Sequence, residues 1–158
     1  MCSSDLLARH LLGLGHRRIA VLTGRPGVST SFDRLEGVRL AHAEVGLPFD
    51  EGLVQFGAYT AETGASGYEM AQVALALDPR PTALFAANNF VAFGALRAVA
   101  EAGLRIPDDL SFVTFDGLPA DWVADPFLTV VTQPAYEIGR RAMGLLLERL
   151  GDAGSAEP

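Results

Sequence analysis

Short apolar runs alternate with longer amphipathic segments along nearly the whole sequence. The first run covers residues 19–22, and the segments between runs carry apolar residues at helical spacing. Strands that alternate with helices need right-handed crossover connections, which build a parallel sheet. The runs lack polar alternation, which is typical of strands covered on both faces. The sequence therefore predicts an α/β fold with a doubly wound parallel sheet.

The same alternation places the individual elements. We expect strands near residues 19–22, 53–56, 82–87, 110–115 and 128–132, and helices near residues 5–14, 31–45, 62–77, 90–102 and 136–150. Gly15, Gly46 and Gly103 stand where helices should end. From Gly151 the tail at 151–158 is small and polar, and we expect it to be disordered.

The amino-acid composition excludes several classes of function. The 158 residues suit one domain, and the net charge of −7 without a basic run offers no footprint for nucleic acid or an anionic membrane. All 12 basic residues are arginine, which excludes mechanisms that need a lysine. The single cysteine, Cys2, permits no internal disulfide. Because the first residues are polar and no apolar run approaches about 20 residues, we expect a cytoplasmic chain without a membrane segment.

Polar side chains follow the predicted strands at the point where each strand ends. Ligands of open parallel sheets bind just outside these carboxyl ends. The side chains that we expect at this edge are Thr30, Arg34, Tyr59, Asn88, Asp116 and Gln133. Guanidinium, amide and carboxylate groups can grip neighbouring hydroxyls, and an aromatic ring can cover an apolar sugar face. The set predicts a site for a sugar or another polyol.

Four of these residues also have a structural interpretation. Asn88 and Asp116 could cap the segments that follow them, because Asn and Asp favour such positions. Arg34 could form a surface ion pair, and Tyr59 alone would be ordinary packing. Their convergence on one edge favours binding.

Enzymatic interpretations find little support in the sequence. His10 and His16 precede the first strand, and His42 stands late in a helix, so no histidine reaches the carboxyl edge for a Ser–His–Asp arrangement. The histidine spacing does not suit a metal. The glycines at 13 and 15 precede a strand, whereas a dinucleotide fingerprint follows one. We expect no catalytic residue, no metal and no cofactor.

A series of motifs resembles the LacI/GalR family of transcriptional regulators. The resemblance covers about residues 10–150, and its specificity lies in the order and spacing of the motifs. They are HLLGLGHRRIA at 10–20, RLEG at 34–37, PTALFAANN at 81–89, AFGAL at 92–96, GLRIPDDLSFVTFD at 103–116, PFLTVVTQP at 126–134 and EIG at 137–139.

This resemblance implies an effector-binding domain of the periplasmic-binding-protein-like type, with two α/β subdomains around a ligand that is often a sugar. Residues 1–134 would form the carboxy-terminal subdomain, and 135–150 would be a crossover helix of the other subdomain. By motif position, the six residues expected from the strand ends are also the family's ligand contacts. In the full-length protein a helix-turn-helix would bind operator DNA, and the regulator would be a homodimer.

The chain departs from the family's pattern in several places. It lacks the helix-turn-helix, most of the amino-terminal subdomain and the last strand, so we expect a fragment whose cleft has one wall. Asn89 and Gly117 stand where the family carries acidic residues. The alternative is a fragment of a periplasmic sugar-binding protein of an ABC transporter, which shares the fold.

Overall fold

A five-stranded parallel sheet forms the centre of the computed structural model, which describes residues 4–58, 65–117 and 128–153. Its strands are β1 (Ile19–Gly24), β2 (Val54–Gly57), β3 (Ala83–Ala86), β4 (Ser111–Phe115) and β5 (Thr129–Val131). They lie in the order β2-β1-β3-β4-β5. All pairings are parallel, so the doubly wound α/β prediction is confirmed.

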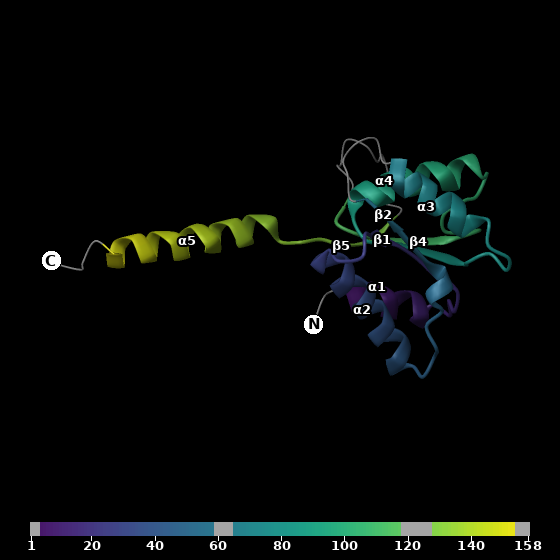
Figure 1. The fold of residues 1–158 in the computed structure, drawn as a ribbon, viewed down its shortest axis with the longest axis horizontal. Coiled ribbons are helices and arrows are strands. Elements are labelled where there is room, and N and C mark those ends of the chain that lie inside the picture. The colour runs from purple at the N-terminus through teal and green to yellow at the C-terminus, as the bar shows by residue number, and fades with distance from the viewer. Residues whose placement is uncertain (1–3, 59–64, 118–127, 154–158) are drawn as a thin grey trace.

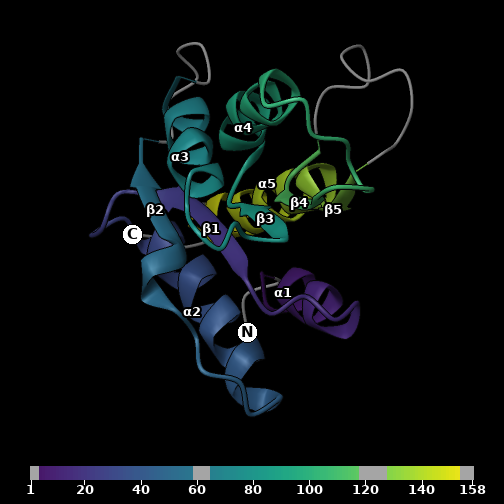
Figure 2. The same cartoon turned by 90° about the vertical axis from the view of Figure 1, so that its right-hand side faces the viewer.

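Four helices cover the two faces of this sheet (Figures 1 and 2). One face carries α1 (Ser4–Gly13) and α2 (Ser29–Glu44), and the other carries α3 (Ala65–Leu75) and α4 (Asn89–Glu101). The strands supply both cores because successive side chains point to opposite faces. Ile19 and Val21 pack toward α1 and α2, whereas Ala20 and Leu22 pack toward α3 and α4. This two-sided burial explains why the strands read as unbroken apolar runs.

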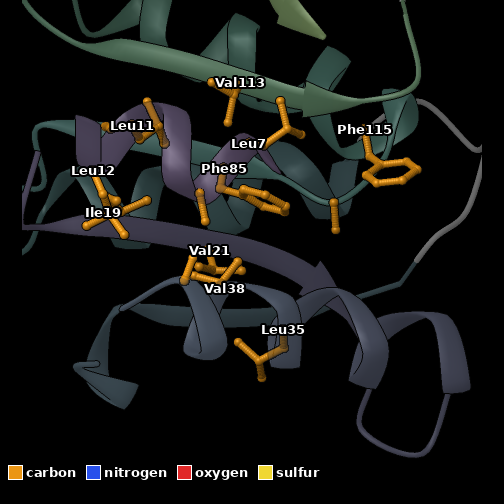
Figure 3. Close-up of a cluster of buried hydrophobic side chains, with 14 of the residues drawn as sticks. Leu7, Leu11, Leu12, Ile19, Val21, Leu35, Val38, Phe85, Val113 and Phe115 are labelled. Atoms are coloured by element: carbon orange, nitrogen blue, oxygen red, sulfur yellow. The ribbon is translucent and has the colours of Figure 1, made fainter. Parts of the chain in front are cut away.

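The core under α1 and α2 is the one with the larger side chains (Figure 3). Phe85 at the centre of the sheet is fully buried, with Leu7 and Leu11 of α1 and Val38 of α2 in the same cluster. Removing a side chain of this size from such a core costs about 3–5 kcal/mol. This core therefore stabilises the sheet whose carboxyl edge carries the predicted binding residues.

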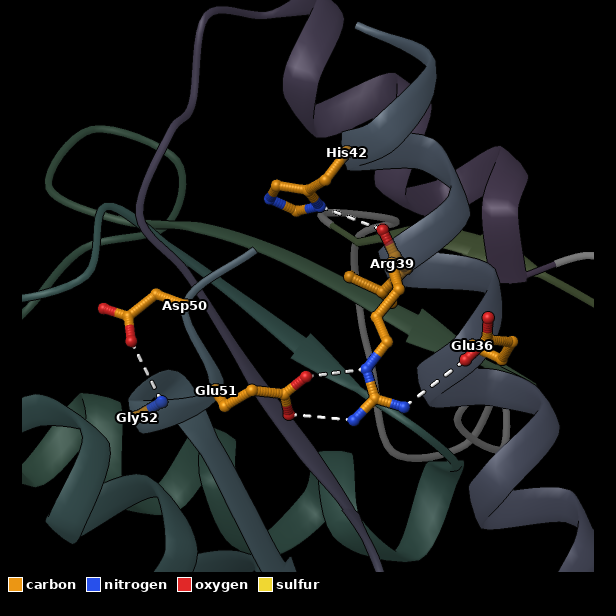
Figure 4. Close-up of polar contacts among 7 residues, drawn as sticks. Glu36, Arg39, His42, Asp50, Glu51 and Gly52 are labelled. Atoms are coloured by element: carbon orange, nitrogen blue, oxygen red, sulfur yellow. Dashed lines mark hydrogen bonds and ion pairs between the residues drawn. The ribbon is translucent and has the colours of Figure 1, made fainter. Parts of the chain in front are cut away.

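The connection from α2 to β2 is held by polar contacts (Figure 4). Arg39 donates to both carboxylate oxygens of Glu51, at 2.7 and 2.8 Å, and to Glu36 at 3.3 Å. Asp50 caps the short 3-10 helix η1 (Glu51–Leu53) by accepting from the Gly52 amide at 2.9 Å. The Arg39 guanidinium lowers the pKa of Glu51 below its usual value. These groups are at least partly exposed to solvent, so each ion pair contributes about 1 kcal/mol at most.

The last helix, α5 (Ala135–Ala153), differs from the other four. It extends away from the sheet in Figure 1, and its apolar side chains, including Ile138, Leu145 and Leu147, are more than half exposed. The sequence predicts a tail from Gly151, but α5 continues to Ala153, because one glycine weakens a helix by about 1 kcal/mol without ending it. Residues 154–158 lie outside the described part. The assignment of α5 to another subdomain stays a prediction.

Candidate functional site

The carboxyl edge of the sheet is where the sequence predicts the binding residues. Five of the six lie in the described part of the chain, at or beside the ends of β3, β4 and β5 or in the first half of α2. Tyr59 lies outside the described residues.

Arg34 crosses this edge from α2. Its Nη1 donates to the carbonyl oxygen of Ala87, directly after β3, and its Cζ lies 4.3 Å from the ring centroid of Phe115 at the end of β4. An arginine stacked on an aromatic face is favourable, and the stacking also fixes the plane of the guanidinium. The alternative interpretation, a surface ion pair with a neighbour on α2, is wrong for this side chain in the described part of the chain. Its other N–H groups make no hydrogen bond within the described residues.

Asp116 and Gln133 form a pair at the next two strand ends. Gln133 donates from Nε2 to both carboxylate oxygens of Asp116, at 3.2 and 3.0 Å, and its backbone amide reaches Oδ1 at 3.4 Å. Asp116 has a φ of +66°, a left-handed backbone that Asp tolerates better than most residues. Its own amide donates to the carbonyl of Val131 at 2.8 Å, so this turn continues the β4–β5 ladder.

The unusual backbone of Asp116 determines where its carboxylate points. A non-glycine residue in this region costs about 1–3 kcal/mol, and such residues cluster at functional sites. The carboxylate keeps further acceptor positions beyond those that Gln133 uses, because two oxygens offer about four lone pairs. The pair can therefore accept hydroxyl donors without breaking.

Asn88 caps α4, as its structural interpretation predicts. Its Oδ1 accepts from the Val91 amide at 2.8 Å, and its backbone is extended. The cap uses only the side-chain oxygen of Asn88. The side-chain amide nitrogen makes no hydrogen bond within the described part of the chain. Capping and binding are thus compatible, because the cap fixes Asn88 with its two N–H donors free.

Thr30 lies in the first turn of α2 and is exposed. The N-cap of this helix is Val28, which has no side-chain acceptor for the first amides of the helix. The Ser31 and Phe32 amides donate to the Val28 carbonyl, so the positive dipole end beside the Thr30 hydroxyl is open mainly at the amides of Ser29 and Thr30. This end of α2 suits an oxygen-rich molecule.

The contacts bring four of the predicted residues to one edge. Arg34 contacts Ala87 and Phe115. These two residues directly precede Asn88 and Asp116 in the sequence, so Arg34 lies close to both. Sequence reasoning missed Phe115, whose ring carries Arg34. Phe115 ends an apolar run, so the sequence pattern predicts a core residue. Only its position directly before Asp116 indicates that it could take part in the site.

The amino edge of the sheet holds polar residues of a different kind. His16 reaches the Thr82 hydroxyl with Nδ1 at 2.8 Å and the Ser111 hydroxyl with Nε2 at 2.9 Å. Burial, with a smaller effect from His10, lowers the pKa of His16 below its usual value. His42 is buried, and its Nδ1 lies 2.9 Å from the Val38 carbonyl. Both histidines make structural contacts within the fold.

The described residues of the carboxyl edge supply hydrogen-bond donors and acceptors and contain no metal-binding group. Among them, no three His, Cys, Asp or Glu side chains gather in a way that could hold a metal ion. Arg34 and Asp116 form no ion pair with each other in this part of the chain. The edge offers oriented donors and acceptors, which is what a binding site needs.

Comparison with known proteins gives this edge a context. A family model described as a periplasmic binding protein-like domain matches residues 8–158. The HTH-type transcriptional repressor PurR of Haemophilus influenzae is 36% identical over 145 residues, which are 92% of this chain and 42% of the repressor. The chain thus spans less than half the length of the curated relatives it matches. None of the described helices is both long and apolar enough to cross a membrane.

Solved structures agree with the sequence relatives. A regulatory protein of the LacI family from Chloroflexus aggregans has a TM-score of 0.83 and 34% identity, covering 99% of this chain and 54% of that one. The transcriptional regulator CelR in complex with cellobiose has a TM-score of 0.83 and 32% identity, covering 99% of this chain and 46% of that one. The chain therefore belongs to the periplasmic binding protein-like domain family, and within it resembles the effector-binding domains of LacI-type transcriptional regulators.

Proposed function

We propose that this chain is the effector-sensing part of a LacI-type transcriptional regulator and that its effector is a sugar. The observation that carries the proposal is the carboxyl edge itself. Arg34 stacked on Phe115 and Asp116 paired with Gln133 place oriented donors and a carboxylate on neighbouring strand ends. The similar regulator CelR, solved with cellobiose, supports a sugar as the ligand class.

Each side chain has a distinct role in this proposal. Asp116 accepts from two hydroxyls, while Arg34 and the amide nitrogen of Asn88 donate to ring or hydroxyl oxygens. Gln133 holds the carboxylate in place, and Thr30 with the first turn of α2 contacts the far end of the ligand. Tyr59 supplies the ring that covers an apolar sugar face.

The protein acts by binding and not by catalysis. The relatives named above are transcriptional regulators. This agreement favours the regulator over a fragment of a periplasmic sugar-binding protein. Operator DNA would be bound by a helix-turn-helix elsewhere in the full-length regulator, which would act in the cytoplasm as a homodimer.

The proposal assigns residues 1–134 to one wall of the effector cleft and α5, predicted at 135–150, to the other subdomain. The exposed apolar side chains of α5 support this division, because a helix with a broad apolar face needs a covering layer. A single wall leaves half of the ligand in water, so the isolated chain should bind sugars weakly.

The DNA directly upstream of the Met1 codon tests the regulator assignment. An in-frame segment encoding a helix-turn-helix and the remainder of the amino-terminal subdomain is the expected result. An in-frame signal sequence would instead support the transporter-associated binding protein and would overturn the proposal.

A further inference from the structure

A hollow of about 660 Å³ lies between β2 and α3. β2 and β5 are at opposite ends of the sheet (Figure 2), so the hollow is far from the Asp116–Gln133 pair. Gln55, Phe56 and Gly57 of β2 line it together with Ala58, which follows the strand, although successive strand residues point to opposite faces. Because the hollow touches residues that point to both faces, we infer that it runs along the outer edge of β2. We call this the β2–α3 groove.

The outer edge of β2 has no strand beside it. β2 ends the sheet order and pairs with β1 alone among the described residues. In a parallel ladder, the backbone groups of a strand alternate between its two sides. The outer side of β2 therefore presents unpaired N–H and C=O groups to the groove, which is how sheet edges accept an added strand.

The α3 wall of the groove is tightly anchored to β2. The Ala58 amide donates to Ser66 Oγ at 2.8 Å, and a Cβ added at Gly57 would lie 2.1 Å from that oxygen. Glycine is thus required for this approach of helix to strand. Farther along, Met70 forms a buried floor, while Phe56 and Val73 stay about half exposed on the two sides.

Two charged side chains line the β2–α3 groove. Arg25 follows β1 at the carboxyl edge of the sheet, next to the end of β2, and Glu69 lies on α3. Both side chains are exposed, and neither makes an ion pair within residues 4–58, 65–117 and 128–153. The groove therefore offers a free guanidinium at the end where a strand parallel to β2 would finish.

We propose that the β2–α3 groove binds an extended peptide that adds to β2 as a further parallel strand. Its backbone pairs with the outer edge of β2. Its C-terminal carboxylate accepts hydrogen bonds from the Arg25 guanidinium, whose planar fork can bind both carboxylate oxygens. Apolar side chains of the peptide lie on Phe56, Met70 and Val73, and a basic side chain pairs with Glu69. This peptide is a partner in addition to the effector.

A peptide array tests this proposal. It carries random hexapeptides with free C-terminal carboxylates and is probed with the purified 158-residue chain. We expect a subset with apolar residues at alternate positions to bind. Amidation of the C-terminus and the Arg25→Gln variant should each weaken these peptides about tenfold or more, since a hydrogen bond to a charged group is lost. The Arg141→Gln variant on α5 is the matched control and should bind as the unchanged chain does.

Hydrogen exchange identifies the binding mode. A bound peptide should slow the exchange of amides within Val54–Gly57, because strand addition covers them. The proposal is wrong if no peptide binds, if binding is indifferent to amidation and to Arg25→Gln, or if exchange in β2 is unchanged. Protection of β2 that rises with protein concentration in the absence of peptide would show pairing with a second copy and would also overturn it.

Discussion

The two edges of the sheet use similar polar residues for opposite purposes. At the amino edge, both nitrogens of His16 are engaged by Thr82 and Ser111, so the ring ties β3 and β4 together. At the carboxyl edge, Arg34, Asn88 and Asp116 each make internal contacts but keep further donors or acceptors. A polar group that the fold satisfies completely stabilises the fold, and one that it only orients is available to a ligand.

Replacing Asp116 with Ala should have the largest effect on binding. Two hydrogen bonds from ligand hydroxyls to a carboxylate contribute about 1.5–3 kcal/mol each, so their loss weakens sugar binding by two orders of magnitude or more. Calorimetric titration with the bound sugar measures this loss. Asp108→Ala, which removes an exposed ion pair with Arg105, is the control and should bind normally. Unchanged affinity in Asp116→Ala would exclude Asp116 as a contact.

The Arg34→Lys variant sharpens the comparison within the carboxyl edge. Lysine keeps the charge but loses the planar stacking on Phe115, so affinity should fall about tenfold even though the net charge is unchanged. The same titration measures it, with Arg97→Lys on α4 as the control. Equal affinity in both variants would mean that only the charge of Arg34 matters.

The His16→Ala variant tests the opposite edge. Two hydrogen bonds are lost, and at about 0.5–1.5 kcal/mol each the free energy of unfolding should fall by about 1–3 kcal/mol. Urea denaturation measures this change. Sugar affinity should stay within error, and a loss of affinity comparable to that of Asp116→Ala would erase the distinction between the edges.

The pH dependence of stability gives the smallest effect. The pKa of His16 in the folded chain is lowered, so the unfolded chain binds more protons than the folded chain once the pH falls below about 6.5. The stability that His16 contributes is therefore present above this pH and decreases as the pH falls toward its folded pKa. In His16→Gln this component should vanish. Parallel stability curves for the two proteins across that range would contradict it.

The fold was largely predictable because its strands are buried on both sides. Continuous apolar runs leave only one arrangement of layers, and the glycines that end α1 and α2 marked their boundaries: Gly15 and Gly46 have φ of +94° and +68°. α5 runs past the predicted boundary at Gly151 to Ala153, because a single glycine lowers the stability of a helix without ending it.

The candidate site was predictable only in its location. Parallel topology places every strand end at one edge, so Arg34, Asn88, Asp116 and Gln133 could be assigned to it from their positions alone. Their internal contacts could not, because the Gln133 amide and the Asp116 carboxylate meet only once β4 and β5 are in register. The stacking of Arg34 on Phe115 depends on helix packing in the same way.

A nuclear magnetic resonance titration of the 158-residue chain with cellobiose, ribose and glucose tests the central claim most directly, because it detects weak binding and locates it. The account predicts that at least one sugar shifts the side-chain N–H signals of Arg34, Asn88 and Gln133 together, with one saturation curve, and leaves the His16 ring unchanged. Shifts centred on His16, or none at the carboxyl edge with any of the three sugars, would contradict the assignment of this edge as a sugar site.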